Sequence, residues 1–220
     1  MLTSLACSLP LRVPIVVSFC AAFTAAAQAP GDVRVALIIG NSAYPGSLEL
    51  LNPANDAKAM GDAMRGLGFD VVELRDGSKA QMADAVAILN EKLKNRQGVG
   101  MLYYAGHGLQ MDARNYMVPV NARIAKAADV PQESLEVGNV INAFKAAGNR
   151  INIVVLDACR DNPFGGVTTG KGLAPLDASS GTFLAYATAP GNVAEDGDAK
   201  SGRPVHAVPV ARTQKTTGPD

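Results

Sequence analysis

The 220-residue sequence has no net charge and few cysteines and histidines. Twenty Lys and Arg residues balance twenty Asp and Glu residues, and hydrophobic residues make up 48% of the chain. A neutral chain has no general attraction to nucleic acid or to anionic lipid, so we expect no nucleic-acid partner and recognition of a substrate by a local site. The length and the apolar content suit one domain with a substantial core better than two domains.

Cysteine occurs only at positions 7, 20 and 159. Cys7 and Cys20 lie in a leader-like segment, and its removal would leave Cys159 alone, which excludes an internal disulfide. A lone cysteine in an exported protein is either a small buried residue or a reactive thiol. Histidine is scarcer still, because His107 is accompanied only by His206 near the C-terminus. Cys159 and His107 are therefore the candidates for nucleophilic chemistry.

The leader-like segment is typical of a secretory signal peptide. Arg12 precedes an apolar run from Val13 to Ala27 that ends in small residues. This pattern predicts a signal peptide over residues 1–27, cleaved after Ala27, and a periplasmic or secreted protein with no stable membrane association. A membrane anchor is the alternative, although the run is shorter than the ~20 residues that span a bilayer.

Strand-like and helix-like segments alternate over the middle of the chain. Short aliphatic runs predict buried strands, at residues 33–41, 69–74, 99–108, 151–159 and 181–191. Apolar residues at helical spacing predict helices between them, with Ala57, Met60, Met64 and Leu67 on the buried face of the first and Met82, Val86, Leu89 and Leu93 on that of the second. A third helix is predicted within residues 134–149. The alternation predicts an α/β fold whose mostly parallel central sheet has helices on both faces.

The first helix has candidate signals at both ends. Asn52 or Asn55 is a plausible N-cap, and Gly68 is a plausible stop.

Ligands bind beyond the carboxyl ends of the strands in such sheets, and the two candidate residues lie there. His107 follows the third strand and Cys159 ends the fourth, 52 positions later. If these strands are neighbours, His107 can take the proton of a thiol that is mostly protonated at neutral pH. The backbone N–H groups of Gly108 and Cys159 are candidates for an oxyanion hole. A purely structural histidine in a glycine-rich turn is the alternative.

Two segments, YYAGHG and LDACRDNPF, resemble the bacterial caspase-like peptidases, the metacaspase and orthocaspase branch of the caspase fold, and YATAPG is similar to the family's fifth strand. A histidine about 50 residues before the cysteine belongs to the family pattern. The resemblance covers residues 33–198 and implies a caspase-like three-layer sandwich. It also implies a cysteine endopeptidase acting on peptide or protein substrates, with Cys159 as the nucleophile and His107 as general base and then acid.

The residues around the nucleophile differ from those of the animal caspases, which cut after aspartate and have glutamine two positions before the cysteine. Asp157 stands there instead, and alignment on the fifth strand places Asp196 and Leu50 where the pocket arginines would be. Two carboxylates imply a pocket for Arg or Lys. Asp157 as a cap of the loop after the strand is the alternative, and Asp161 and Glu195 are further candidate acids.

The segment GGVTTGKG, residues 165–172, matches the glycine and lysine spacing of a phosphate-binding loop. It lacks both the Ser or Thr after the lysine and a following helix, so we predict no nucleotide binding. We interpret it as a flexible linker of the kind that the family often cuts during maturation, here between Lys171 and Gly172. We expect no cofactor and no metal site. Calcium activation is the alternative that stays open, because the sequence shows no ligand cluster of convincing spacing by which to judge it.

Residues 199–220 have neither helical spacing nor any likeness to the helix and strand that follow in the family. We therefore expect an irregular tail, an uncovered edge on the fifth strand, self-association through that edge and weak or absent peptidase activity. A truncated, non-catalytic interaction domain of the caspase fold is the alternative to a peptidase.

Overall fold

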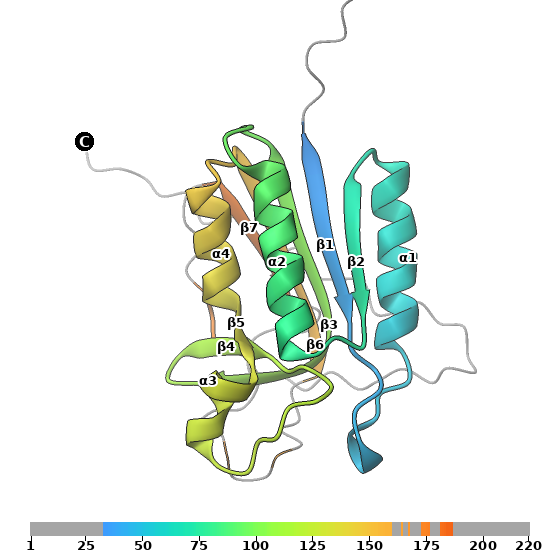
Figure 1. The fold of residues 1–220 in the computed structure, drawn as a ribbon, viewed down its shortest axis with the longest axis vertical. Helices are drawn as coiled ribbons and strands as arrows, with labels where there is room; N and C mark the ends of the chain where they lie inside the picture. Colours follow the sequence, from blue (N-terminus) through green and yellow to red (C-terminus); the bar gives the residue numbers. More distant parts are fainter. Residues whose placement is uncertain (1–32, 160–163, 165–166, 168–172, 177–180, 187–220) are drawn as a thin grey trace, which may run out of the picture. The chain divides into compact units, whose positions relative to one another are not determined.

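A sheet of parallel strands forms the centre of the domain (Figure 1). The computed structural model describes residues 33–159, 164, 167, 173–176 and 181–186. The parallel strands lie in the order β2-β1-β3-β6-β7, with β1 at Arg34–Gly40, β2 at Asp70–Arg75, β3 at Val99–Met111, β6 at Ile151–Cys159 and β7 at Thr182–Tyr186. All five strands form where the sequence predicts them. Residues 187–191 of the predicted fifth strand, the predicted signal peptide and the predicted tail lie outside the described residues.

Helices cover both faces of this sheet, as predicted, because each helix has one apolar side. Met82, Leu89 and Leu93 of α2 (Lys79–Leu93) are fully buried, and they share one core with Phe144 of α4 (Val137–Ala146). Figure 1 shows α2 and α4 side by side on one face. The other face packs against α1 (Pro53–Gly66) through a core of apolar strand residues and Ala57. No helix in the described part of the chain has the length and hydrophobicity to cross a membrane.

The ends of α1 differ in detail from the prediction. Asn52 takes the N-cap position, although its side chain makes no capping hydrogen bond to the helix, and a proline follows at the first helical position, so Asn55 is not the cap. Gly68 ends the helix with φ +78°, as expected, and the next N–H bonds back to Met64 O at 3.0 Å. Leu67 is 59% exposed, so its predicted place on the buried face is wrong, because it follows the last helical residue and no longer keeps the helical spacing.

An antiparallel extension widens the sheet beyond the carboxyl end of β3, and the sequence analysis missed it. β3 continues to Met111 and turns back into β4 (Arg114–Met117), which pairs with β5 (Leu135–Glu136). Asp112 and Ala113 make the turn with φ of 50° and 59°, the conformation of a two-residue type I′ hairpin turn. Neither residue is the glycine that usually signals such a turn, which explains why the hairpin was missed.

Short helical turns complete the layer of loops at this end: η1 (Gly46–Leu48), η2 (Ala127–Asp129) and α3 (Val130–Glu133). A third apolar cluster lies beneath them and includes Tyr44, Leu109, Tyr116, Val118 and Val130. The loops at the carboxyl edge of the sheet are therefore packed on a core of their own.

Candidate active site

The carboxyl end of β6 lies beside His107 because β3 and β6 are adjacent and parallel. His107 lies within β3, which continues to Met111, and does not follow the strand as predicted. The register of the two strands pairs His107 with Cys159 across the strand boundary. The structure thus brings together the two positions that the sequence analysis selected, 52 residues apart in the chain. Their catalytic roles remain predictions.

His107 is held in a defined orientation. Its side chain is buried, with the residue only 5% exposed, and its Nε2 lies 2.7 Å from the carbonyl oxygen of Leu48. A carbonyl oxygen can only accept a hydrogen bond, so Nε2 carries the proton in this arrangement. In the neutral imidazole Nδ1 is then the basic nitrogen, the one that can take a proton from a thiol.

Tyr44, which the sequence analysis missed, packs directly on this imidazole. The two ring centroids are 4.4 Å apart at an angle of 54°. The Tyr44 hydroxyl accepts a hydrogen bond from His107 N at 3.1 Å and donates one to Val118 O at 2.8 Å. Burial raises the pKa of Tyr44 to about 12, so the phenol keeps its proton at neutral pH. Its place in the loop after β1, at the carboxyl edge of the sheet, was the one signal available.

Tyr104 secures the other side of the histidine backbone. Its hydroxyl lies 2.7 Å from His107 O and 3.0 Å from Val118 O, and it accepts a bond from Val118 N at 3.1 Å. Burial raises the pKa of Tyr104 well above its ordinary value. Two tyrosine hydroxyls therefore hold the N–H and the carbonyl of His107, one on each side.

The glycines beside His107 have an internal packing role. A Cβ on Gly106, which has φ +151°, would lie 2.7 Å and 2.8 Å from the hydroxyls of Tyr104 and Tyr44. A Cβ on Gly108 would lie 2.9 Å from the Ala158 Cβ. Close contacts within the chain therefore explain why glycine stands on both sides of His107. The oxyanion hole from the N–H groups of Gly108 and Cys159 stays a prediction.

Asp157 lies inside β6, two residues before Cys159. The loop that it would cap in the alternative interpretation begins outside the described residues, so that alternative stays open. The Asp157 side chain is half-buried and accepts a hydrogen bond from the Tyr103 hydroxyl at 3.0 Å. Burial, together with the negative charge of Asp157, raises the pKa of Tyr103. Leu50, the other described pocket position, is partly buried in the loop cluster. The remaining candidate acids, Asp161, Glu195 and Asp196, lie outside the described residues.

The described end of the linker between β6 and β7 is anchored to the domain. Asn115 of β4 donates to Ala174 O at 2.8 Å and accepts from Ala174 N at 2.6 Å. Leu173 and Ala174 are buried. The flexible linker of the sequence analysis therefore ends no later than Leu173, while its predicted cut, between Lys171 and Gly172, lies outside the described residues.

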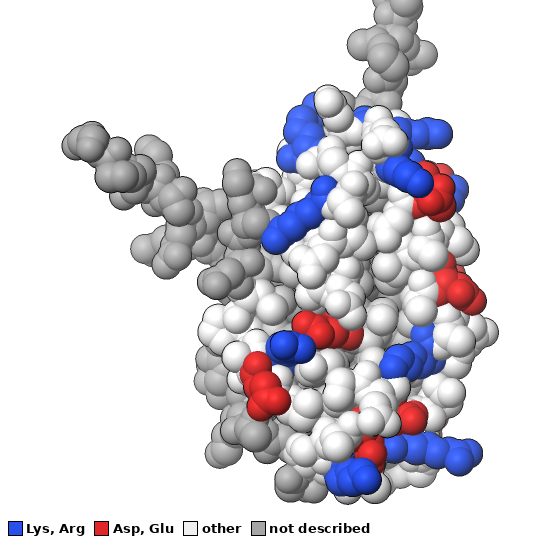
Figure 2. Space-filling model, turned by 60° about the vertical axis from the view of Figure 1, so that its left-hand side comes forward, with Lys and Arg blue, Asp and Glu red and all other residues white. Residues whose placement is uncertain are grey.

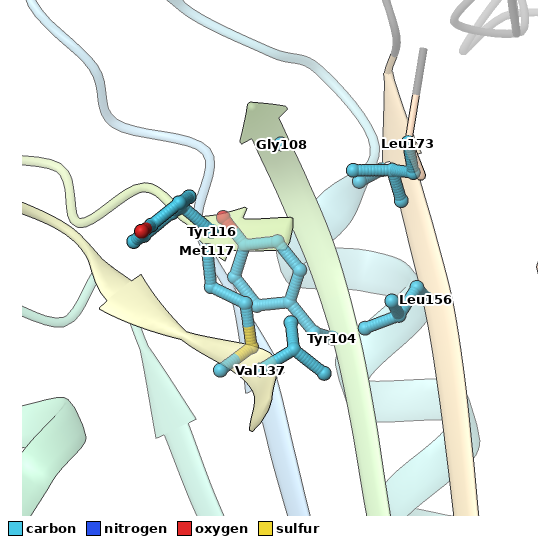
Figure 3. A pocket seen from close by; sticks show the side chains of 8 residues that line it. Tyr104, Gly108, Tyr116, Met117, Val137, Leu156 and Leu173 are labelled. Atoms are coloured by element: carbon cyan, nitrogen blue, oxygen red, sulfur yellow. The ribbon is translucent and has the colours of Figure 1, made fainter. Parts of the chain in front are cut away.

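A small apolar cavity lies beneath the site, on the face covered by α2 and α4 (Figure 3). The side chains of Tyr104, Met117, Leu156 and Leu173 point toward one another around it. It is too narrow to admit a water molecule. It is a small packing gap, and a peptide side chain cannot enter it without displacing the core.

The described residues contain no group of three or more His, Cys, Asp or Glu side chains that could hold a metal ion. Basic and acidic side chains are both spread over the face drawn in Figure 2. On that face no large area of one charge sign would attract an oppositely charged partner.

Comparison with known proteins gives three findings. A family model described as "Caspase domain" matches residues 33–207. Mucosa-associated lymphoid tissue lymphoma translocation protein 1 of Homo sapiens and its Mus musculus homolog are each 34% identical to the chain over 131 residues, which is 58% of this chain and 15% of either relative. The Drosophila initiator caspase Dronc superposes with a TM-score of 0.50 at 12% identity, covering 71% of this chain and 55% of that one, and this likeness shows the fold alone.

Proposed function

Because this chain belongs to the caspase-domain family of peptidases, we propose that it is a cysteine endopeptidase with Cys159 as its nucleophile and His107 as its base. The pairing of these two positions at the carboxyl edge of β3 and β6 carries the proposal. The bond from His107 Nε2 to Leu48 O supports it, since that bond leaves Nδ1 as the nitrogen that can accept a proton.

The reaction follows from these two groups. His107 Nδ1 takes the thiol proton of Cys159, and the thiolate sulfur attacks the carbonyl carbon of the scissile peptide bond. The N–H groups of Gly108 and Cys159 donate to the resulting oxyanion. When the C–N bond breaks, His107 gives its proton to the leaving amine, and a thioester remains. His107 then takes a proton from water, and the water oxygen attacks the thioester carbon. The C–S bond breaks to release the acid product, and His107 returns the proton to the sulfur of Cys159.

We further propose cleavage after Arg or Lys. Asp157 places a half-buried carboxylate two residues before the nucleophile, and Asp196 is the second proposed acid. A desolvated guanidinium or ammonium group needs such negative charge, whereas an aspartate side chain would be repelled by it.

The test compares peptides that differ only in having Arg, Lys or Asp before a fluorogenic leaving group. We expect cleavage of the first two, none of the third, and complete loss of activity in Cys159→Ala and His107→Ala. His206→Ala is the matched control and should keep full activity. Iodoacetamide should label the native protein at Cys159. Full activity of Cys159→Ala would refute the assigned nucleophile, and faster cleavage after Asp would refute the assigned pocket.

We also propose that the enzyme is exported and works without a cofactor. The leader over residues 1–27 supports export, and sequencing the amino terminus of the mature protein tests it. Calcium activation is left open by the sequence, and activity measured with and without a calcium chelator decides between the two.

A further inference from the structure

The loop between β1 and α1 makes the contacts that orient His107. Tyr44 and the carbonyl of Leu48 both belong to it. The direction of the Nε2 bond therefore depends on where this loop is held. Two hydrogen bonds within the loop end on the Ser42 carbonyl, which accepts from Tyr44 N at 2.8 Å and from Leu50 N at 3.0 Å. The Ser42 Oγ accepts a third bond, from Ala54 N of α1, at 3.0 Å.

Asp76 fastens this loop from another part of the sheet. It is the first residue after β2, and its Oδ1 accepts hydrogen bonds from Ser42 N at 2.7 Å and from Ala43 N at 2.8 Å. Bonds from backbone N–H groups to a carboxylate are charge-assisted and roughly twice as strong as neutral ones. The single carboxylate oxygen thus fixes the residue from which Tyr44 and Leu50 are positioned.

The backbone of Asp76 is itself held against the end of β1. Its N–H bonds to Gly40 O at 2.9 Å, and the following N–H, of Gly77, bonds to the side chain of the buried Asn41 at 3.0 Å. Asp76 has φ +51°, in the left-handed region that aspartate tolerates better than most residues. The conformation aims the carboxylate at the loop, where its charge adds to burial in raising the pKa of Tyr44.

We propose that Asp76 is a positioning residue for His107: its carboxylate holds Ser42 and Ala43, and through them it places the Leu48 carbonyl that accepts the His107 Nε2 proton. Asp76 touches neither the imidazole nor the reacting atoms. The expected fall in kcat rests on the proposed peptidase function. The expected change in which nitrogen of His107 is protonated does not.

The experiment uses three variants of the full chain. Asp76→Gly removes the acceptor and suits the positive φ, so the backbone conformation is retained. Asp76→Asn keeps an oxygen acceptor without the charge, in a residue that also tolerates this conformation. Asp112→Gly is the matched control, because it makes the same replacement at φ 50° in the exposed turn after β3.

Two readouts are compared. Imidazole 15N NMR, with only two histidines in the chain, reports which nitrogen of His107 is protonated. We expect the Nε2–H form in the wild type and in Asp112→Gly, a mixture of tautomers in Asp76→Gly, and a smaller change in Asp76→Asn. With an Arg peptide, kcat should fall about tenfold in Asp76→Gly with little change in KM, and only about two- to threefold in Asp76→Asn.

The outcomes separate the two proposals. A wild type without peptidase activity whose His107 tautomer still depends on Asp76 refutes the proposed function and supports the positioning role. An unchanged tautomer in folded Asp76→Gly overturns the positioning role, and so does an equal fall of kcat in Asp112→Gly. If Asp76→Gly does not fold, amide hydrogen exchange at Ser42 and Ala43 is measured in Asp76→Asn instead, together with the His107 tautomer. Faster exchange at Ser42 and Ala43 with a shifted tautomer supports the role, whereas unchanged exchange or an unchanged tautomer overturns it.

Discussion

Replacing Tyr44 by phenylalanine isolates the hydroxyl that supports the histidine backbone. The ring would stay on the imidazole, 4.4 Å away between centroids. The substitution removes the acceptor of the His107 N–H and one donor to Val118 O. Val118 O keeps a donor, because it also accepts from Asn41 Nδ2 at 3.0 Å. The Tyr104 hydroxyl, 3.3 Å from that of Tyr44, keeps its bonds to His107 O and Val118 N. The main loss therefore falls on the His107 N–H.

The expected cost follows from that single amide. A buried donor without a partner costs about 1–3 kcal/mol, and His107 is only 5% exposed. We expect the free energy of unfolding to fall by about 2 kcal/mol, which corresponds to a fall in Tm of about 4–8 °C for a domain of this size. The kcat should fall only a few-fold, since the contact between the two rings and the Nε2 bond to Leu48 O are kept.

Thermal unfolding followed by circular dichroism measures the effect, with urea unfolding as a second estimate. Tyr116→Phe is the matched control. Tyr116 belongs to the same buried cluster and is 3% exposed, but within the described part of the chain its hydroxyl makes no hydrogen bond. That variant should change the free energy of unfolding by less than about 0.5 kcal/mol. Equal Tm values for Tyr44→Phe and the wild type would refute the reasoning, because the His107 N–H would then have another acceptor.

Three further measurements test other parts of the structure. The folded chain raises the pKa of three tyrosines above 10: Tyr44, Tyr103 and Tyr104. Above pH 10 these tyrosines therefore ionise in the unfolded chain before they ionise in the folded one. Urea unfolding should show the full free energy of unfolding below pH 10 and a loss as the pH rises from 10 toward 12. Ala113→Gly should raise the unfolding free energy by about 0.5–1 kcal/mol, because glycine suits φ 59°; a lower Tm would contradict this. Among the described strands β7 pairs only with β6, and its Phe183 is 49% exposed. We expect this edge to drive self-association, so Phe183→Lys should shift the sedimentation distribution toward monomer. An unchanged distribution would exclude self-association through this edge.

Most of the fold could be predicted from the sequence because its strands and helices are long, apolar and strongly periodic. β6 begins and ends where predicted, since only Asn152 and Asp157 interrupt the apolar residues of Ile151–Cys159 and an arginine stands on either side. The hairpin after β3 was missed because its turn is made by Asp112 and Ala113 instead of by glycine. Short strands without a turn signal depend on tertiary pairing, which composition does not reveal.

The candidate site divides in the same way. His107 and Cys159 could be predicted because each lies at or near the carboxyl end of an aliphatic run and each is a scarce residue type in this chain. Asp157 could be selected from its place beside the nucleophile, but its contact with Tyr103 depends on the register of two strands 54 positions apart. Tyr44 could not be selected from the sequence, since tyrosine is common in loops and only the fold brings this one against His107.

The acceptor for His107 Nε2 shows why part of such a site leaves no mark on the sequence. Leu48 contributes only its carbonyl oxygen, and every residue type has one, so replacing its side chain keeps the acceptor provided that the loop stays in place. The side chain that holds the loop is the carboxylate of Asp76, through Ser42 and Ala43. Substitutions that disturb the orientation of His107 should therefore be found at Asp76 more readily than at Leu48, although Leu48 contacts the imidazole and Asp76 does not.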